Sequence, residues 1–145
     1  MYIEDIFKNI DFKIKPDQNY RTEYLFRCKK SIYKIFKKEK NFFFSNLIIK
    51  KEENSDKILK KELLKIDSMS TIAIGYIINK ICQKLKSDEN YINIGVWKGF
   101  SLIAGMINTT CSVYGVDNFS EFNGPRKELI NNFDNLKNDK KHFFY

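Results

Sequence analysis

The feature that most constrains this chain is a pair of glycines at the end of a short apolar run. Residues 91–95 read Tyr-Ile-Asn-Ile-Gly, and Gly95 and Gly99 are spaced as Gly-x-x-x-Gly. A second apolar run, 112–116, ends at Asp117, eighteen residues after Gly99. We predict a strand over 91–95, a helix over 99–108 and a strand over 112–117. Such alternation indicates a parallel sheet with right-handed crossovers.

The alternation continues to the last residue of the sequence. After the loop 118–124, Pro125 suits the first turn of a helix, where its missing N–H leaves no hydrogen bond unmade. The apolar stripe of this helix comprises Leu129, Ile130, Phe133 and Leu136. Residues 142–145 predict a third strand, and there the sequence stops. The predicted class is α/β, a partial Rossmann-like parallel sheet of about three strands preceded by a helical N-terminal region.

The first half of the chain differs from the second in charge and in glycine content. Residues 1–66 hold 17 lysines and arginines against 10 acids, and all six glycines lie in the second half. We therefore predict a basic, mainly helical region over 1–67 and an α/β half-domain over 68–145, which is truncated in its third strand. Basic residues interleaved with tyrosines over 20–40 also fit a nucleic-acid-associated protein, but a solvated lysine-rich face explains them more simply.

Local patterns divide the first half into short elements. A short helix or irregular arm is expected over 1–20, and amphipathic helices over 21–39 and 55–66. The apolar stripe of the first of these helices fits either a core or a subunit contact in a homo-oligomer. Ser55 is the expected cap of the helix over 55–66, and Ser68 or Ser70 that of a helix reaching about Lys86. The apolar runs 42–44 and 47–49 fit either strands or buried loops.

The composition of the chain excludes several classes of protein. Apolar residues make up 43% and aromatic residues 15%, which is typical of a globular chain. The sequence contains no membrane-span-length apolar stretch and no basic start followed by an apolar run, so we predict a cytoplasmic protein that does not enter a membrane. We expect neither a disulfide framework nor a metal site, because the chain has one histidine, His142, and three scattered cysteines, Cys28, Cys82 and Cys111.

The glycine turn is the place where a ligand is expected. In a parallel sheet, ligands bind at the carboxyl ends of the strands, against the start of the next helix. Gly95 permits a tight turn and a close approach of backbone to ligand, and the Ser101 hydroxyl can cap the helix or contact the ligand. Asp117, at the end of the second strand, can accept hydrogen bonds from both hydroxyls of a ribose. These residues predict a site for an adenosine-containing cofactor.

Trp97 narrows the choice of cofactor. The dinucleotide fingerprint G-x-G-x-x-G has a glycine at this position so that the backbone can approach a pyrophosphate. The P-loop pattern is also missing from the sequence. An adenosine cofactor without phosphates tolerates a bulkier turn, and S-adenosylmethionine is the candidate.

Residues 68–145 resemble the N-terminal half of a class I S-adenosylmethionine-dependent methyltransferase. The likeness is to the subgroup whose first motif reads acid-x-Gly-x-x-x-Gly-x-Ser, matched by Tyr91 to Ser101, and to a second motif matched by Tyr114 to Phe119. The resemblance implies methyl transfer to a small-molecule acceptor. The family has about seven strands, whereas this sequence ends in the third, so a truncated, non-catalytic cofactor-binding remnant is the alternative. Catalytic residues cannot be assigned.

Carried over position by position, the resemblance assigns roles to the motif residues. Gly95 and Gly99 would border the methionine part and the ribose, and Asp117 would bind the ribose hydroxyls. The adenine would lie near Asn118 and Phe119. Asn93 replaces the acid that the family usually has and brings no charge to the cofactor's ammonium group.

Each of these residues also has an interpretation without a ligand. Gly95 and Gly99 can serve as turn glycines in a sheet protein, and Asp117 as a helix cap or a turn former. Trp97 can be a packing residue or a ligand-facing ring, and Asn93 can simply hydrogen-bond at the end of its strand.

Overall fold

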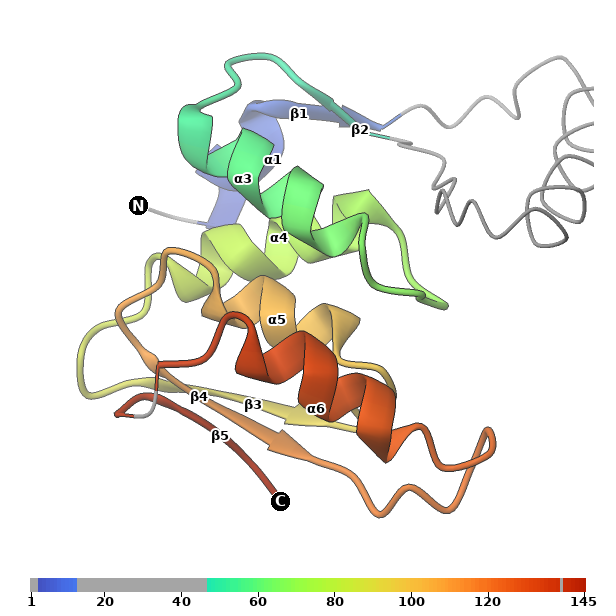
Figure 1. Cartoon of the computed structure of the whole chain (residues 1–145). Helices are drawn as coiled ribbons and strands as arrows, with labels where there is room; N and C mark the ends of the chain where they lie inside the picture. The colour runs from blue at the N-terminus through green and yellow to red at the C-terminus, as the bar shows by residue number, and fades with distance from the viewer. Residues whose placement is uncertain (1–2, 13–46, 139) are drawn as a thin grey trace, which may run out of the picture.

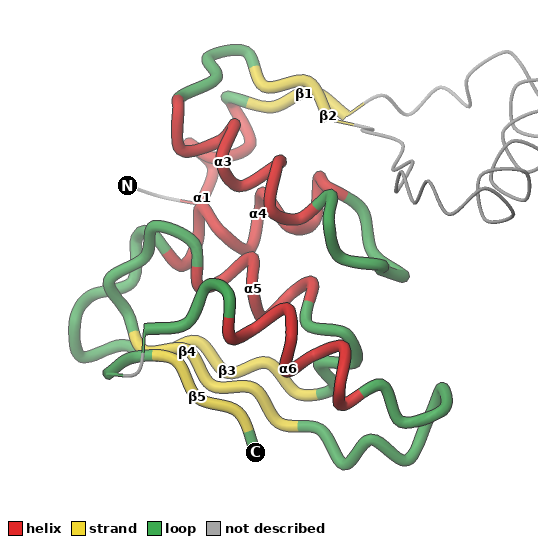
Figure 2. The backbone as a smooth tube through the Cα atoms, viewed as in Figure 1, coloured by secondary structure: helices red, strands yellow, loops and turns green. Residues whose placement is uncertain are grey.

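The structure is a computed structural model that describes residues 3–12, 47–138 and 140–145. The predicted helix over 21–39 and the run 42–44 lie outside the described residues, as does the suggested basic surface over 20–40. Figures 1 and 2 show helices stacked between a short antiparallel strand pair and a parallel sheet. None of the described helices combines the length and the apolar character needed to cross a bilayer.

The parallel sheet consists of β3 (Asn90–Ile94), β4 (Ser112–Val116) and β5 (His142–Phe144), in the order β3-β4-β5. All three strands run in the same direction, and their register places Ile92 opposite Tyr114 and Tyr114 opposite Phe143. The predicted three-stranded parallel sheet is therefore confirmed. The carboxyl ends of β3 and β4 lie side by side, which brings the residues after each strand together.

Two helices, α5 (Phe100–Met106) and α6 (Arg126–Asp134), connect the strands and lie on the same face of the sheet (Figure 1). Six of the seven residues of α5 are buried, as befits a helix packed on several sides. Asn79 of α4 (Ile72–Cys82) holds the end of α5: its amide nitrogen donates to the carbonyl oxygens of Ala104 and Ile107, at 2.8 and 2.7 Å. α5 thus packs between the sheet and α4.

The N-terminal elements join the same core. They are α1 (Ile3–Lys8), β1 (Ile10–Phe12), β2 (Leu47–Ile49) and α3 (Asn54–Leu63). β1 and β2 pair antiparallel, so the ambiguous run 47–49 is a strand. The arm expected over 1–20 contains both a helix and a strand within its described part. Buried side chains from these elements belong to one apolar cluster with those of the parallel sheet and its helices, and they include Ile6, Ile10, Leu59 and Leu63.

The cap predicted for α3 was wrong. Glu53, not Ser55, is the cap residue, and its backbone N–H donates to Oδ2 of Asp56 at 2.9 Å. This reciprocal bond satisfies a backbone donor at the helix start, and it occurs because Asp56 lies three residues after the cap. Asp56 is almost fully buried, and its Oδ1 lies 2.7 Å from Nζ of Lys80 on α4. Asp56 therefore stabilises the N-terminus of α3 and also joins α3 to α4.

The start of α4 was also predicted too early. Thr71 caps this helix and its hydroxyl accepts from the backbone N–H of Ile74. The hydroxyl of Ser68 instead accepts from the backbone N–H of Ser70, at 2.7 Å, so both serines form a local turn before the helix. Pro125 precedes α6 as its cap residue rather than lying inside the first turn.

Candidate functional site

The glycine turn joins the carboxyl end of β3 to the start of α5. The backbone N–H of Gly95 donates to the carbonyl oxygen of Val116 at 2.8 Å, so the turn begins against the last residue of β4. The N–H of Gly99 donates to the carbonyl oxygen of Val96 at 2.7 Å and closes the turn. The turn and the residues after β4 therefore occupy one edge of the sheet, as the motif order predicted.

The backbone of this turn is left-handed at three positions. The φ angles are +77° at Gly95, +48° at Trp97 and +96° at Gly99. A Cβ at Gly99 would lie 2.7 Å from Cδ1 of Leu129, whereas a Cβ at Gly95 would meet no heavy atom within 4 Å. Gly99 is thus required by packing as well as by conformation. Gly95 borders open space, where a ligand can approach the backbone.

Asp117 reaches across from β4 to the glycine turn. Its Oδ2 accepts from the backbone N–H of Trp97 at 2.8 Å, and its Oδ1 accepts from the N–H of Phe119 at 2.7 Å. A carboxylate oxygen can accept more than one hydrogen bond, so each oxygen retains accepting capacity for a ligand hydroxyl. The half-buried carboxylate therefore fastens two loops together and still has oxygens able to accept further hydrogen bonds at the same edge.

Asn93 and Ser101 form the second polar pair of the predicted site. The Ser101 hydroxyl donates to Oδ1 of Asn93 at 2.8 Å and joins the end of β3 to the first turn of α5. Both side chains are half-buried. The structure thus brings together two residues that the motif assigned to the cofactor site, and it shows the hydroxyl bonded to the amide.

Trp97 packs within the turn. The Nζ of Lys98 lies 4.8 Å from the centre of its ring, and the Phe122 ring meets it edge-on with the centroids 6.2 Å apart. Lys98 also pairs with Asp67, at 3.1 Å. The indole Nε1 is buried and has no hydrogen-bond partner in the described part of the chain. A buried donor of this kind is uncommon in native structures.

The loop after Asp117 folds back on itself. Oδ1 of Asn118 accepts from both the backbone N–H and the hydroxyl of Ser120, at 3.0 and 2.9 Å. Phe119 has a φ of +55°, and the guanidinium of Arg126 lies 5.9 Å from the centre of its ring. Asn118 is exposed, and its amide oxygen is engaged in its own turn. Phe119 lies half-buried beside the turn.

Some neighbours of the site were not found from the sequence. Phe122 lies beside Trp97 and Arg126 beside Phe119. The path of the loop 118–124 depends on four residues with left-handed φ angles rather than on a periodic pattern. Asp67 reaches Lys98 across 31 positions. Aromatic and charged residues in an irregular loop carry no spacing signal, so no sequence pattern could place them.

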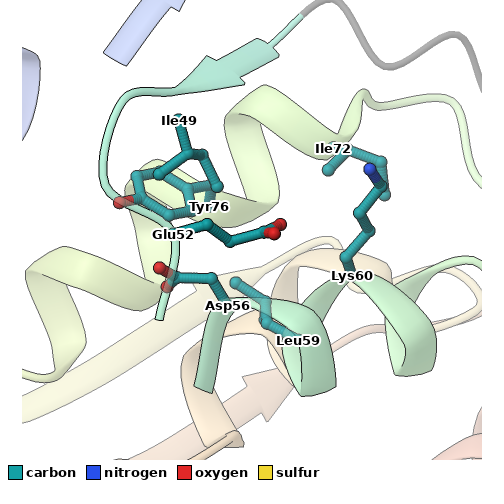
Figure 3. Close-up of a pocket in the computed structure, with 7 residues that line it drawn as sticks. All are labelled: Ile49, Glu52, Asp56, Leu59, Lys60, Ile72 and Tyr76. Atoms are coloured by element: carbon teal, nitrogen blue, oxygen red, sulfur yellow. The ribbon is translucent and has the colours of Figure 1, made fainter. Parts of the chain in front are cut away.

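A separate pocket lies between α3, α4 and the end of β2 (Figure 3). Its volume is about 130 Å³, which is below the range of pockets that hold small-molecule cofactors. Its seven lining residues include none of the predicted site residues: Ile49, Glu52, Asp56, Leu59, Lys60, Ile72 and Tyr76. Burial raises the pKa of the Tyr76 hydroxyl, which accepts from the Asn9 amide at 3.4 Å. We interpret this pocket as a structural feature around the buried Asp56–Lys80 pair.

No group of three or more potential metal ligands occurs among the residues that the structure describes. Comparison with protein-family models, curated proteins and solved structures gives no significant match. The case for a function therefore depends on the residues at the glycine turn.

Proposed function

We propose that this protein binds S-adenosylmethionine at the glycine turn after β3 and acts as a methyltransferase on a small-molecule acceptor. One observation carries the proposal: the carboxylate of Asp117, at the end of β4, is hydrogen-bonded to the glycine turn after β3, at Trp97. A ligand at this edge would meet the carboxylate, the open backbone of Gly95 and the start of α5 together. The Rossmann-like half-fold is part of the same proposal.

The polar groups present suit an adenosine cofactor without phosphates. Ribose hydroxyls are donors, and the Asp117 carboxylate retains lone pairs to accept from them. The open space at Gly95 admits a ligand against the backbone. Trp97 occupies the position at which the dinucleotide fingerprint has the glycine that a pyrophosphate requires.

The chain's own contribution to such a reaction is positioning. The bound cofactor would supply an electrophilic methyl group on its sulfonium, which an acceptor nucleophile attacks in line. Asp117 would orient the ribose, and Gly95 would allow the backbone to lie close to the cofactor. Orientation of this kind accounts for a large share of the rate in transfer reactions.

Cofactor binding without methyl transfer is the second candidate. It is favoured by the sheet itself, because within the described residues β3 has no strand on its other edge. No residue in a position to select or activate an acceptor is assigned. Turnover separates the two candidates: release of S-adenosylhomocysteine in the presence of a small-molecule acceptor library supports the enzyme, and tight binding without release supports the binding protein.

Isothermal titration calorimetry with S-adenosylhomocysteine tests the site. We expect binding by the wild-type chain and roughly tenfold or greater weakening in Asp117→Asn, since a neutral amide accepts less strongly from the ribose. Asp134→Asn is the matched control, because its exposed carboxylate pairs with Lys137 at the far end of α6. Absence of binding by folded wild-type protein, or equal binding by Asp117→Asn, would reject the proposal.

A further inference from the structure

The parallel sheet has one face that no described helix covers. Helices α5 and α6 lie against the other face (Figure 1). Side chains alternate between the two faces along a strand, and residues opposite each other in register share a face. The uncovered side, here named the open face, therefore comprises Asn90, Ile92, Ile94, Ser112, Tyr114, Val116, Phe143 and Tyr145.

The open face is apolar and accessible. Ile94 is 81% exposed and Ile92 is 60% exposed, and Val116 and Tyr145 are exposed as well. The rings of Tyr114 and Phe143 stack on neighbouring strands, with centroids 5.3 Å apart. Parallel sheets in proteins are normally covered on both faces, and contiguous exposed apolar patches mark interaction surfaces. We therefore expect a partner to cover the open face.

We propose that two copies of this chain associate through their open faces. Within the three strands β3, β4 and β5, the open face carries no lysine, arginine, aspartate or glutamate, although 30% of the chain is charged and its net charge is +8. Lys141, which precedes β5 in the same register, donates from its Nζ to the carbonyl oxygen of Thr110 at 2.8 Å. A charged partner would find no complementary groups on this surface, whereas a second copy meets an equally neutral, apolar one. Two sheets packed face to face bury both open faces in one dry layer.

The distribution of side chains suits a two-fold axis that runs along β4. Such an axis places β3 of one copy over β5 of the other, because β4 is the middle strand. The aliphatic side chains Ile92 and Ile94 then face the aromatic side chains Phe143 and Tyr145 of the second copy, at matching heights in the register. Large rings on one side and smaller aliphatic groups on the other make the surface self-complementary. This interaction is independent of the proposed cofactor site.

Analytical ultracentrifugation over a range of concentrations tests the dimer. We expect wild-type protein to sediment with twice the mass of one chain and Ile94→Lys to sediment as a monomer. Ile58→Lys is the matched control, because Ile58 is 48% exposed on α3, away from the sheet, and it should leave the dimer intact. Circular dichroism establishes that each variant is folded. A monomeric wild type, or an Ile94→Lys variant that still dimerises, would overturn the proposal.

A charge-pair variant tests the arrangement directly. Ile92→Lys alone and Phe143→Glu alone should each be monomeric, since each buries an unpaired charge at the contact. Ile92→Lys combined with Phe143→Glu should recover the dimer, because each new lysine would face a new glutamate across the axis. Failure of the folded double variant to dimerise would overturn the two-fold along β4.

Discussion

Oδ2 of Asp117 accepts a hydrogen bond from the backbone N–H of Trp97, 2.8 Å away, and thereby joins the end of β4 to the turn that follows β3. The Trp97 backbone has a φ of +48°, a conformation that side-chain-bearing residues rarely adopt. A charge-assisted bond to its N–H helps to hold this conformation. The acid therefore supports the turn whether or not a ligand is bound.

Removal of the Asp117 carboxylate should destabilise the protein. Asp117→Ala leaves the N–H groups of Trp97 and Phe119 without their acceptor, and we expect a loss of about 2–3 kcal/mol in the free energy of unfolding. Urea denaturation followed by the fluorescence of Trp97, the only tryptophan, measures the change. Asp134→Ala, at an exposed ion pair, should change the stability by less than about 1 kcal/mol. Equal stability of the two variants would contradict the role of Asp117.

The two glycines of the turn should respond differently to substitution. Gly99→Ala combines a strained φ with a clash against Leu129, so we expect it to lower stability by about 2–4 kcal/mol. Gly95→Ala meets no neighbouring atom and should lose only about 1 kcal/mol through its left-handed backbone. Gly95→Ala should nevertheless weaken binding of S-adenosylhomocysteine, because its methyl group enters the open space beside the turn. Denaturation and calorimetry on the same samples separate the two effects, and a larger stability loss at Gly95 would contradict this assignment.

Asn93→Asp should strengthen cofactor binding. An aspartate keeps an oxygen to accept from the Ser101 hydroxyl and adds a negative charge near the place proposed for the cofactor's ammonium group. The gain is about fivefold in the dissociation constant, the upper end for a partly solvated ion pair. Asn93→Ala, which lacks the acceptor, is the comparison and should bind no more tightly than wild type. An unchanged or weaker affinity in Asn93→Asp would place the ammonium group elsewhere.

His142 should make stability depend on pH. Its Nδ1 accepts from the backbone N–H of Asn138 at 2.9 Å, which requires an unprotonated ring, and burial together with the nearby Lys141 lowers its pKa below 6.5. The unfolded chain therefore takes up a proton first as pH falls. Neutral His142 makes its full contribution to the free energy of unfolding above about pH 6.5, and this contribution decreases as the pH falls below that value.

Denaturation at pH 7.5 and pH 5.5 measures this dependence. Wild-type protein should be less stable at the lower pH, whereas His142→Phe should lose most of the difference, because carboxylates still titrate mainly below this window. The same slope in both proteins would assign the pH dependence to another group.

Much of the fold could be predicted because its signals are local. The strands β3, β4 and β5 begin and end within one or two residues of their predicted bounds, since short apolar runs bounded by glycine and polar residues specify them. The helix caps could not be predicted equally well. Glu53 caps α3 because its backbone N–H can donate to the carboxylate of Asp56, whereas residue type alone favoured Ser55.

The candidate site could likewise be predicted only in part. The sequence indicated Gly95, Gly99 and Asp117 by their spacing, because the order strand, turn, helix, strand and acid requires no long-range information. It could not show that the hydroxyl of Ser101 bonds to Asn93, or that Asn118 is engaged with Ser120 in its own loop. Side-chain partners depend on which atoms the packed helices bring within reach, and residue type leaves several partners open.

By itself, the sequence determined the element order from β3 onward and the position of a turn at which backbone can approach a ligand, since both follow from apolar periodicity and from glycine. Only the tertiary structure decided how that turn is held and what remains uncovered. Asp117 meets Trp97 because parallel pairing places the ends of β3 and β4 side by side. Ile92 and Ile94 are exposed because both crossover helices lie on the opposite face. Alternation along a strand predicts two faces, but only the packing of the helices determines which face is buried.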